Sequence, residues 1–157
     1  MPAAVLPLTS GLDTLVRTVA AMPFAWRPHV HFSAASRYWK RIAKLPEADL
    51  WLLTWMPDQT TDLHDHGNAT AAFTVVQGEL TELRARPGGE LHRTRLRAGD
   101  LSVVPAGAVH DVANTSRRPA ISIHAYSPAL EQMTFWESVP GGLRRLETVV
   151  TDQPEVA

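Results

Sequence analysis

The chain has 157 residues, of which 45% are hydrophobic and 20% charged, and its formal net charge is -1. This size and composition fit one compact domain with a hydrophobic core, and the balanced charge argues against nucleic acid as a partner. No apolar run reaches the roughly 20 residues of a membrane span, and the first residues lack the cationic segment of a secretory signal, so a cytoplasmic protein is expected. The sequence contains no cysteine, which excludes disulfides and restricts any metal ligands to nitrogen and oxygen.

A helix is predicted over residues 10–22, SGLDTLVRTVAAM, because its apolar residues recur at helical spacing. Ser10 and Asp13 resemble a capping box at its start, and Pro23 is expected to end it. We expect this helix to pack against one end of a sheet.

After this helix, short apolar segments alternate with turn sequences rich in glycine and proline. About ten short strands at this spacing indicate a small antiparallel barrel or jelly roll. Residues 36–44 fit a short helix or a strand, and we predict a strand because Trp39 and Arg41 then share one face. Residues 150–157 form a polar tail that is expected to fray. The predicted strands cover residues 36–44, 49–56, 60–66, 72–77, 79–85, 90–96, 101–104, 109–114, 120–126 and 133–139.

Two histidines, His64 and His66, are separated by one residue at the end of a predicted strand. Side chains two residues apart point to the same side of a strand, and the apolar neighbourhood favours the inside of the barrel. Buried imidazoles need a polar partner, for which a divalent metal ion is the natural choice. A third ligand is expected at His110, because the segment from Gly99 to Asn114 resembles the second cupin motif, G-x5-P-x-G-x2-H-x3-N, at every defined position.

The first cupin motif is matched only in part. Asp58 replaces its leading glycine, and the usual glutamate ligand is missing, with Thr70 and Ala71 in that region. Three neutral histidines would leave the charge of a divalent ion uncompensated and would favour an anionic ligand such as a substrate thiolate. Imidazole suits iron, zinc, copper and nickel alike, so the ligands alone do not choose the metal.

A second polar pattern lies on the predicted strand at 120–126, where Ser122, His124 and Tyr126 alternate and therefore share one face. A serine hydroxyl can orient the imidazole, and the imidazole can hydrogen-bond the phenol. This arrangement would place a tuned proton donor beside the metal.

Three segments together resemble the bacterial members of the cysteine dioxygenase family: WMPDQTTDLHDHGNATAAFTVVQGELTE, PAGAVHDVAN and ISIHAYSPALEQMTFWE. With the strand before them they span residues 38–137, in the family's order. The resemblance implies an all-β fold, a small antiparallel cupin-type β-barrel (jelly roll) with the N-terminal helix packed on it. Residues 1–157 are then expected to form a single cupin domain, with the barrel at about 36–139.

The resemblance also implies a non-haem iron enzyme that oxidises L-cysteine with O2 to cysteine sulfinic acid. Fe(II) is the implied cofactor, a small thiol and O2 are the implied partners, and a monomer or weak homo-oligomer is expected. The implied metal ligands are His64, His66 and His110, and the implied Ser-His-Tyr triad is Ser122, His124 and Tyr126.

Members of the family bind the substrate carboxylate with an arginine on the strand that precedes the apolar run at 49–56. By spacing, this role best matches Arg41, with Trp39 in place of a tyrosine. Lys40 or Arg37 would take the role if the register slips.

In animal members a cysteine five residues after the second histidine is crosslinked to the triad tyrosine. Here that position is Ala71, and the sequence contains no cysteine. The crosslink therefore cannot form, and Tyr126 is expected to be a free phenol.

Two other functions stay open at this point. A 3-mercaptopropionate dioxygenase would use the same histidines and triad, with Arg144 or Arg145 as the carboxylate-binding residue. A non-catalytic cupin would keep the metal only as structure, although such a site has no use for a poised phenol.

Five arginines alternate along two neighbouring predicted strands and the residue that follows each. We expect them to form a solvated sheet face, since the chain carries no net positive charge. They are Arg84, Arg86, Arg93, Arg95 and Arg97.

Overall fold

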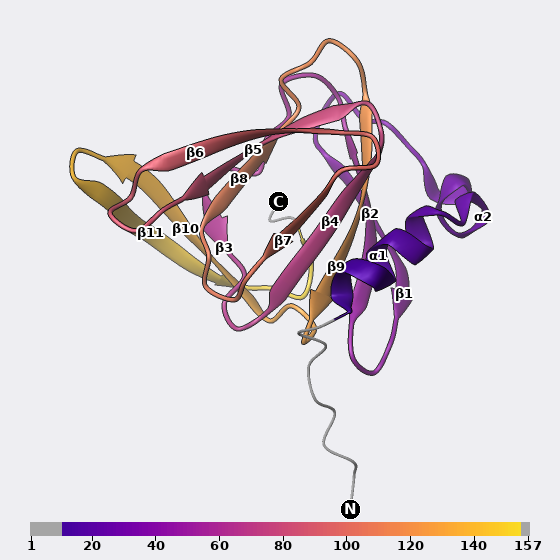
Figure 1. The fold of residues 1–157 in the computed structure, drawn as a ribbon, viewed down its shortest axis with the longest axis horizontal. Coiled ribbons are helices and arrows are strands. Elements are labelled where there is room, and N and C mark those ends of the chain that lie inside the picture. The colour runs from indigo at the N-terminus through magenta and orange to yellow at the C-terminus, as the bar shows by residue number, and fades with distance from the viewer. Residues whose placement is uncertain (1–10, 155–157) are drawn as a thin grey trace, which may run out of the picture.

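The computed structural model describes residues 11–154, so the predicted capping box at Ser10 and the last three residues of the predicted tail lie outside the described residues. Within the described part, the helices α1 (Leu12–Ala20), α2 (Pro23–Trp26) and η1 (Arg27–His29) precede the strands (Figure 1). None of the described helices has the length and apolar character needed to cross a bilayer. The strands are β1 (Tyr38–Lys44), β2 (Asp49–Trp55), β3 (His64–Asp65), β4 (Thr70–Gln77), β5 (Glu79–Ala85), β6 (Leu91–Arg97), β7 (Leu101–Val104), β8 (His110–Ala113), β9 (Ala120–Ser127), β10 (Gln132–Val139) and β11 (Gly142–Val150).

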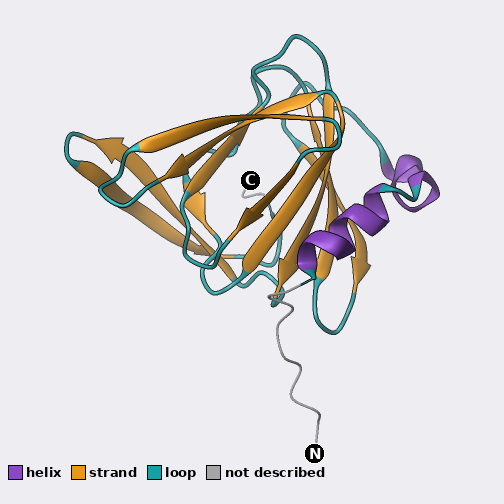
Figure 2. Cartoon of the chain, viewed as in Figure 1, coloured by secondary structure: helices purple, strands orange, loops and turns teal. Residues whose placement is uncertain are grey.

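The strands form two antiparallel sheets, one with the order β1-β2-β9-β4-β7 and the other with the order β11-β10-β3-β8-β5-β6. The sheets face each other as the two walls of a barrel, and the helices lie outside it (Figure 2). Helix α1 packs on the outer face of β4 and β9. The predicted fold class, an antiparallel cupin-type barrel with an N-terminal helix packed on it, is confirmed.

Strand β2 is covered on both faces, since all seven of its residues are buried. Trp51, Leu53 and Trp55 pack inside the barrel. Leu50 and Leu52 point to the other face and pack under α1 with Val16. A continuous apolar run is what a strand covered on both faces requires. Alternation then directs every second residue of each neighbouring strand into the interior.

Several element boundaries differ from the predictions. The predicted strand at 60–66 contains only the two-residue β3, and Pro23, expected only to end the first helix, begins α2. Proline suits this first helical position because its missing N–H would have no intrahelical acceptor there. The edge strand β11 lies beyond the predicted end of the barrel at residue 139. Most of its side chains are exposed or only half-buried, so it lacks the apolar alternation of a core strand, and its backbone pairing with β10 holds it in place.

Candidate metal centre

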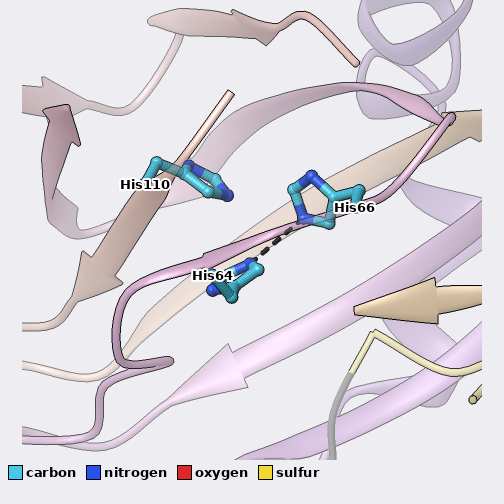
Figure 3. Close-up of side chains that lie close together, drawn as sticks. All are labelled: His64, His66 and His110. Carbon is cyan, nitrogen blue, oxygen red and sulfur yellow. Dashed lines mark hydrogen bonds between the residues drawn. The ribbon is translucent and has the colours of Figure 1, made fainter. Parts of the chain in front are cut away.

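The metal-ligand candidates His64, His66 and His110 come together inside the barrel (Figure 3). His64 on β3 is the direct register partner of His110 on β8, and His66 directly follows β3. Because successive strand residues alternate, Asp65 points the other way, where its carboxylate accepts hydrogen bonds from the Trp136 indole and the Gly67 amide. The three imidazoles are each at most 3% exposed. One nitrogen from each lies within 4.8 Å of the others, and the two Nε2 atoms of His64 and His66 are 3.1 Å apart.

Hydrogen bonds on the far side of two rings fix where their protons lie. His64 Nδ1 is 2.8 Å from the carbonyl oxygen of Asp62, which can only accept, so Nδ1 carries the hydrogen and Nε2 keeps a bare lone pair. His110 Nδ1 is likewise 2.7 Å from the Glu82 carboxylate. The freed His110 Nε2 is buried and has no hydrogen-bond partner among residues 11–154. A buried His110 Nε2 without a partner, close to two further imidazoles, fits a divalent cation, because the cation would satisfy this nitrogen.

The surroundings of His64 and His66 keep these two imidazoles neutral. Burial, and then the neighbouring His110, lowers the pKa of His64 well below its usual 6.5. Burial, and then His64, does the same to the pKa of His66. A neutral imidazole presents its lone pair at neutral pH, so a metal ion does not have to displace a proton.

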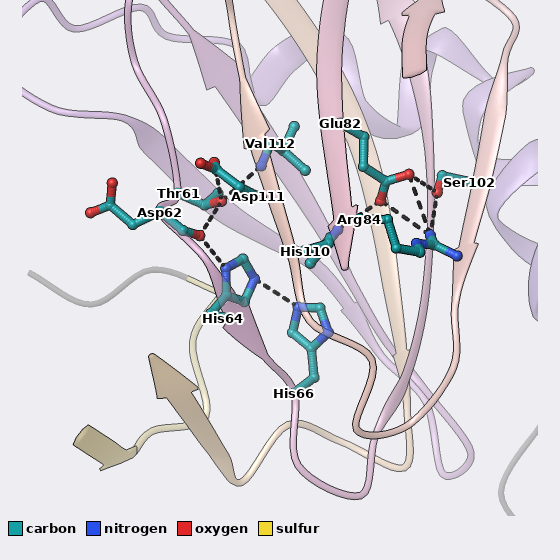
Figure 4. A network of polar contacts seen from close by, with 10 residues as sticks. All are labelled: Thr61, Asp62, His64, His66, Glu82, Arg84, Ser102, His110, Asp111 and Val112. Atoms are coloured by element: carbon teal, nitrogen blue, oxygen red, sulfur yellow. Dashed lines mark hydrogen bonds and ion pairs between the residues drawn. The ribbon is translucent and has the colours of Figure 1, made fainter. Parts of the chain in front are cut away.

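Glu82 on β5 belongs to this site, although it was not predicted from the sequence. Its side chain is buried, and its Oε1 accepts a hydrogen bond from Ser102 at 2.7 Å while Oε2 accepts the one from His110 (Figure 4). Arg84 Nη2 lies 3.2 Å from Oε2. Burial alone would raise the pKa of Glu82, but the bonds from His110 and Ser102 and the charge of Arg84 together lower it. Glu82 is therefore an ionised carboxylate, and it places one negative charge behind a metal ligand.

The position of Arg84 corrects the expectation of a solvated arginine face. Its guanidinium turns inward to Glu82 and Ser102, whereas Arg95 on β6 lies at the surface and pairs with Glu79. A buried carboxylate with a neighbouring hydroxyl gives this one arginine a better partner than water.

The strand β9 carries the three predicted triad residues toward the interior. Trp55 Nε1 donates to Ser122 Oγ at 2.9 Å, which leaves the serine hydrogen free to be donated to His124 Nε2 at 2.7 Å. The His124 ring stacks on Phe73 with an interplanar angle of 8°. Burial, followed by the nearby His110, lowers the pKa of His124 to about 3, so this imidazole is neutral and held on two sides.

Tyr126 lies next to the metal-ligand group, with its ring centroid 5.2 Å from that of His66. Burial raises the pKa of its phenol, so the hydroxyl keeps its proton at neutral pH. Within residues 11–154 no hydrogen bond joins His124 to Tyr126, so the expected imidazole–phenol link is not present. The phenol instead lines a small cavity of about 10 Å³ together with the three metal-ligand candidates and His124.

The structure separates the arginine candidates. Arg41 on β1 lies over the Trp51 ring and pairs with Asp49 at 3.4 Å and Asp152 at 3.5 Å, not with the histidines. Arg37, which precedes β1, is 9% exposed, and its guanidinium lies over the Trp55 ring at 5.1 Å.

Arg37 is also the arginine whose charge acts on the site. Its charge affects the pKa values of His64, His124 and Tyr126. Burial lowers the pKa of Arg37 itself to about 10, which still leaves it charged at neutral pH.

The other cationic candidates lie at the surface. Lys40 is exposed on β1. On the edge strand β11, Arg144 pairs with Glu137 and Arg145 donates to Thr148. Their contacts are on the outside of the barrel, away from the histidine group.

We predict that the metal-free protein loses stability as the pH falls below 6.5. The unfolded chain takes up protons on its histidines there, whereas the lowered pKa values keep His64, His66 and His124 neutral in the fold, so the unfolding free energy rises with pH up to 6.5 and is flat above it. Each of these three histidines should lower the free energy of unfolding by about 1 kcal/mol between pH 6.5 and 5.5. Thermal melts of the apoprotein in matched ionic strength measure the effect, and a melting temperature that does not change across this range would contradict it.

We further predict that Glu82→Gln weakens metal binding by about 10- to 100-fold, because the amide keeps an acceptor for His110 but removes the charge. Glu79→Gln is the matched control, since Glu79 lies on the same strand but pairs with Arg95 at the surface. Competition titrations of Zn(II) or Co(II) against a chelator measure both variants. Equal affinities in the two variants would show that Glu82 does not act on the metal site.

Comparisons with known proteins agree with this geometry. The family model of cysteine dioxygenase type I matches residues 11–138. Among solved structures, an uncharacterised protein with a double-stranded β-helix domain from Klebsiella pneumoniae is similar at a TM-score of 0.59 and 21% identity, over 77% of this chain and 93% of that one.

Two further structures share the fold at similar identity. A protein from Thermus thermophilus matches at a TM-score of 0.58 and 22% identity, over 65% of this chain and 92% of that one. An oxalate oxidase matches at a TM-score of 0.57 and 21% identity, over 66% of this chain and 56% of that one. These structures support the barrel architecture, and the family match over most of the chain gives the more specific result: the chain belongs to the cysteine dioxygenase type I family.

Proposed function

We propose that the protein is a non-haem iron dioxygenase that oxidises L-cysteine with O2 to cysteine sulfinic acid, with iron(II) held by His64, His66 and His110. The observation that carries the proposal is the convergence of three buried imidazoles in a member of this family. Both oxygen atoms of O2 join the sulfur, which supplies all four electrons, so the reaction needs no other reductant. Iron(II) bound by the histidines would supply the coordination positions at which a thiolate and O2 can react with each other.

The substrate carboxylate is bound by Arg37 in this proposal. A planar guanidinium pairs well with a carboxylate, and Arg37 is held in a buried position on the Trp55 ring close enough to the site to act on Tyr126. Arg41, which has the better sequence spacing, is the second candidate, because it is only half-buried whereas Arg37 is buried.

Tyr126 serves as a hydrogen-bond donor to the reacting groups. Its raised pKa makes it a poor base at neutral pH, but its hydroxyl can stabilise negative charge that develops beside it. Ala71 is the register partner of Tyr126, at the position of the family's crosslinking cysteine. The phenol is therefore free, and packing against His66 holds its ring.

We predict that Tyr126→Phe lowers kcat by at least 10-fold while iron content stays at the wild-type level, because the hydroxyl acts on the reaction and not on the metal. Oxygen consumption with L-cysteine and elemental analysis of the purified protein measure the two quantities. Loss of iron in the variant would contradict this role, as would an unchanged kcat.

We predict that Arg37→Met raises the KM for L-cysteine by 10-fold or more, because the carboxylate loses its partner. Cysteamine, which lacks the carboxylate, provides the control substrate, and its kcat/KM should change much less. Arg41→Met is the matched variant four residues further along the chain. A large loss in the Arg41 variant alone, for L-cysteine but not for cysteamine, would assign the carboxylate to Arg41 instead.

The choice of thiol is tested with the same assay. A kcat/KM for 3-mercaptopropionate far above that for L-cysteine would change the proposed substrate but keep the reaction. No oxygen uptake by the iron-loaded protein with any small thiol would leave a non-catalytic metal-binding cupin.

A further inference from the structure

The segment that follows β11, residues 151–154, crosses from one wall of the barrel to the other. Its first residue donates a backbone hydrogen bond from Thr151 N to Glu131 O at 3.0 Å, just before β10. Its third residue, Gln153, accepts a side-chain hydrogen bond from Trp39 on β1 at 3.0 Å. We call residues 151–154 the strap. Since β10 and β1 belong to different sheets, the strap joins the two walls.

The end of the strap lies in the metal-site cavity. Pro154 is buried and lines this cavity with the three metal-ligand candidates and Tyr126. A proline suits an apolar wall because it has no N–H group to leave unsatisfied. With Pro154 in place the cavity measures about 10 Å³, which is room for about one water molecule and less than any amino acid needs. Because Pro154 forms part of this wall, movement of the strap would widen the space beside the histidines.

The strap is held by contacts that can open locally. Asp152 is 68% exposed and its carboxylate lies 3.5 Å from Arg41, and exposed ion pairs of this kind contribute little. The bond between Trp39 and Gln153 is also at the surface. Only Pro154 is buried, and no strand ladder has to break to release it. Segments with few buried contacts open at low free-energy cost and often act as lids.

We infer that the strap gates the metal site and that Pro154 is a specificity-determining residue, which limits the length of the thiol that fits when the strap is closed. This inference rests on the proposed function for the identity of the substrate. In the closed state the strap places an apolar surface near the reacting groups and excludes water from them. It also links substrate entry to Arg41 and Trp39, the two residues of β1 that hold it.

Metal accessibility tests the gate without relying on turnover. The probe is the rate at which a chelator removes Co(II) from the loaded protein, measured by stopped-flow absorbance. A chain ended at Val150 lacks the strap, and a chain ended at Pro154 is the matched control because it keeps the strap. We expect removal to be at least 10-fold faster without the strap and unchanged in the control. Equal rates in both would overturn the gate.

Point substitutions test the strap in the full-length chain, where a truncated chain that fails to fold cannot confuse the result. Asp152→Asn combined with Gln153→Ala removes both side-chain anchors and should also speed removal of Co(II). Pro154→Gly should raise kcat/KM for homocysteine, which is one methylene longer, at least 10-fold relative to L-cysteine. An unchanged ratio of the two substrates would remove the specificity role from Pro154.

These measurements separate the inference from the proposed function. Faster Co(II) removal with no oxidation of any thiol would retain the gate and reject the dioxygenase. The opposite outcome is normal thiol oxidation in every strap variant, with unchanged Co(II) removal and an unchanged ratio of substrates. It would retain the dioxygenase and reject the gate.

Discussion

Burial of imidazole rings inside an apolar barrel is the constraint from which the rest of the site follows. A buried ring nitrogen must have a partner, and the surrounding protein provides one for two of the rings. The Asp62 carbonyl takes the outer nitrogen of His64, and the Glu82 carboxylate takes that of His110. Because these two partners each take an Nδ1 atom, the Nε2 atoms of His64 and His110 are left on the side of the histidine group. The outer partners thus orient two of the rings for metal binding.

Three charged side chains, Glu82, Arg84 and Arg37, lie around the histidine group. The missing glutamate ligand of the motif would have reduced the charge of a bound ion directly and occupied one of its coordination positions. Glu82 instead places its charge behind His110, so it can stabilise a cation through the imidazole while leaving the position open. Arg84 and Ser102 satisfy the outer side of Glu82, and Arg37 provides a positive charge on the side of Tyr126.

The sequence predicted the features that depend on local period and on short motifs. Alternation within a strand gave the shared face of His64 and His66, and a turn with fixed proline and glycine positions pointed to His110. Glu82 could not be found this way, because its partner His110 lies 28 residues further along the chain and on a neighbouring strand. One signal was available in the sequence. Glu82 shares a face of β5 with Leu80, which is buried, and an acid on the buried face of a strand needs a partner. The choice between Arg37 and Arg41 could not be made from spacing alone, because it depends on how deeply each guanidinium is buried and on contacts such as that of Arg41 with Asp152, which comes from a tail that was expected to fray.

The free phenol of Tyr126 shows how packing can replace a covalent link. In the register of β4 and β9 its partner is Ala71, whose small side chain leaves the ring without a bonded neighbour on that side. The orientation of β9 is instead fixed two and four residues earlier, where Ser122 and His124 are held by the Trp55 indole and the Phe73 ring. Since Trp55 also supports Arg37, one tryptophan positions both the strand that presents the phenol and the cation beside it. A rigid aromatic framework of this kind provides the preorganisation that a crosslink would otherwise supply, because the groups it holds do not have to be ordered again when substrate binds.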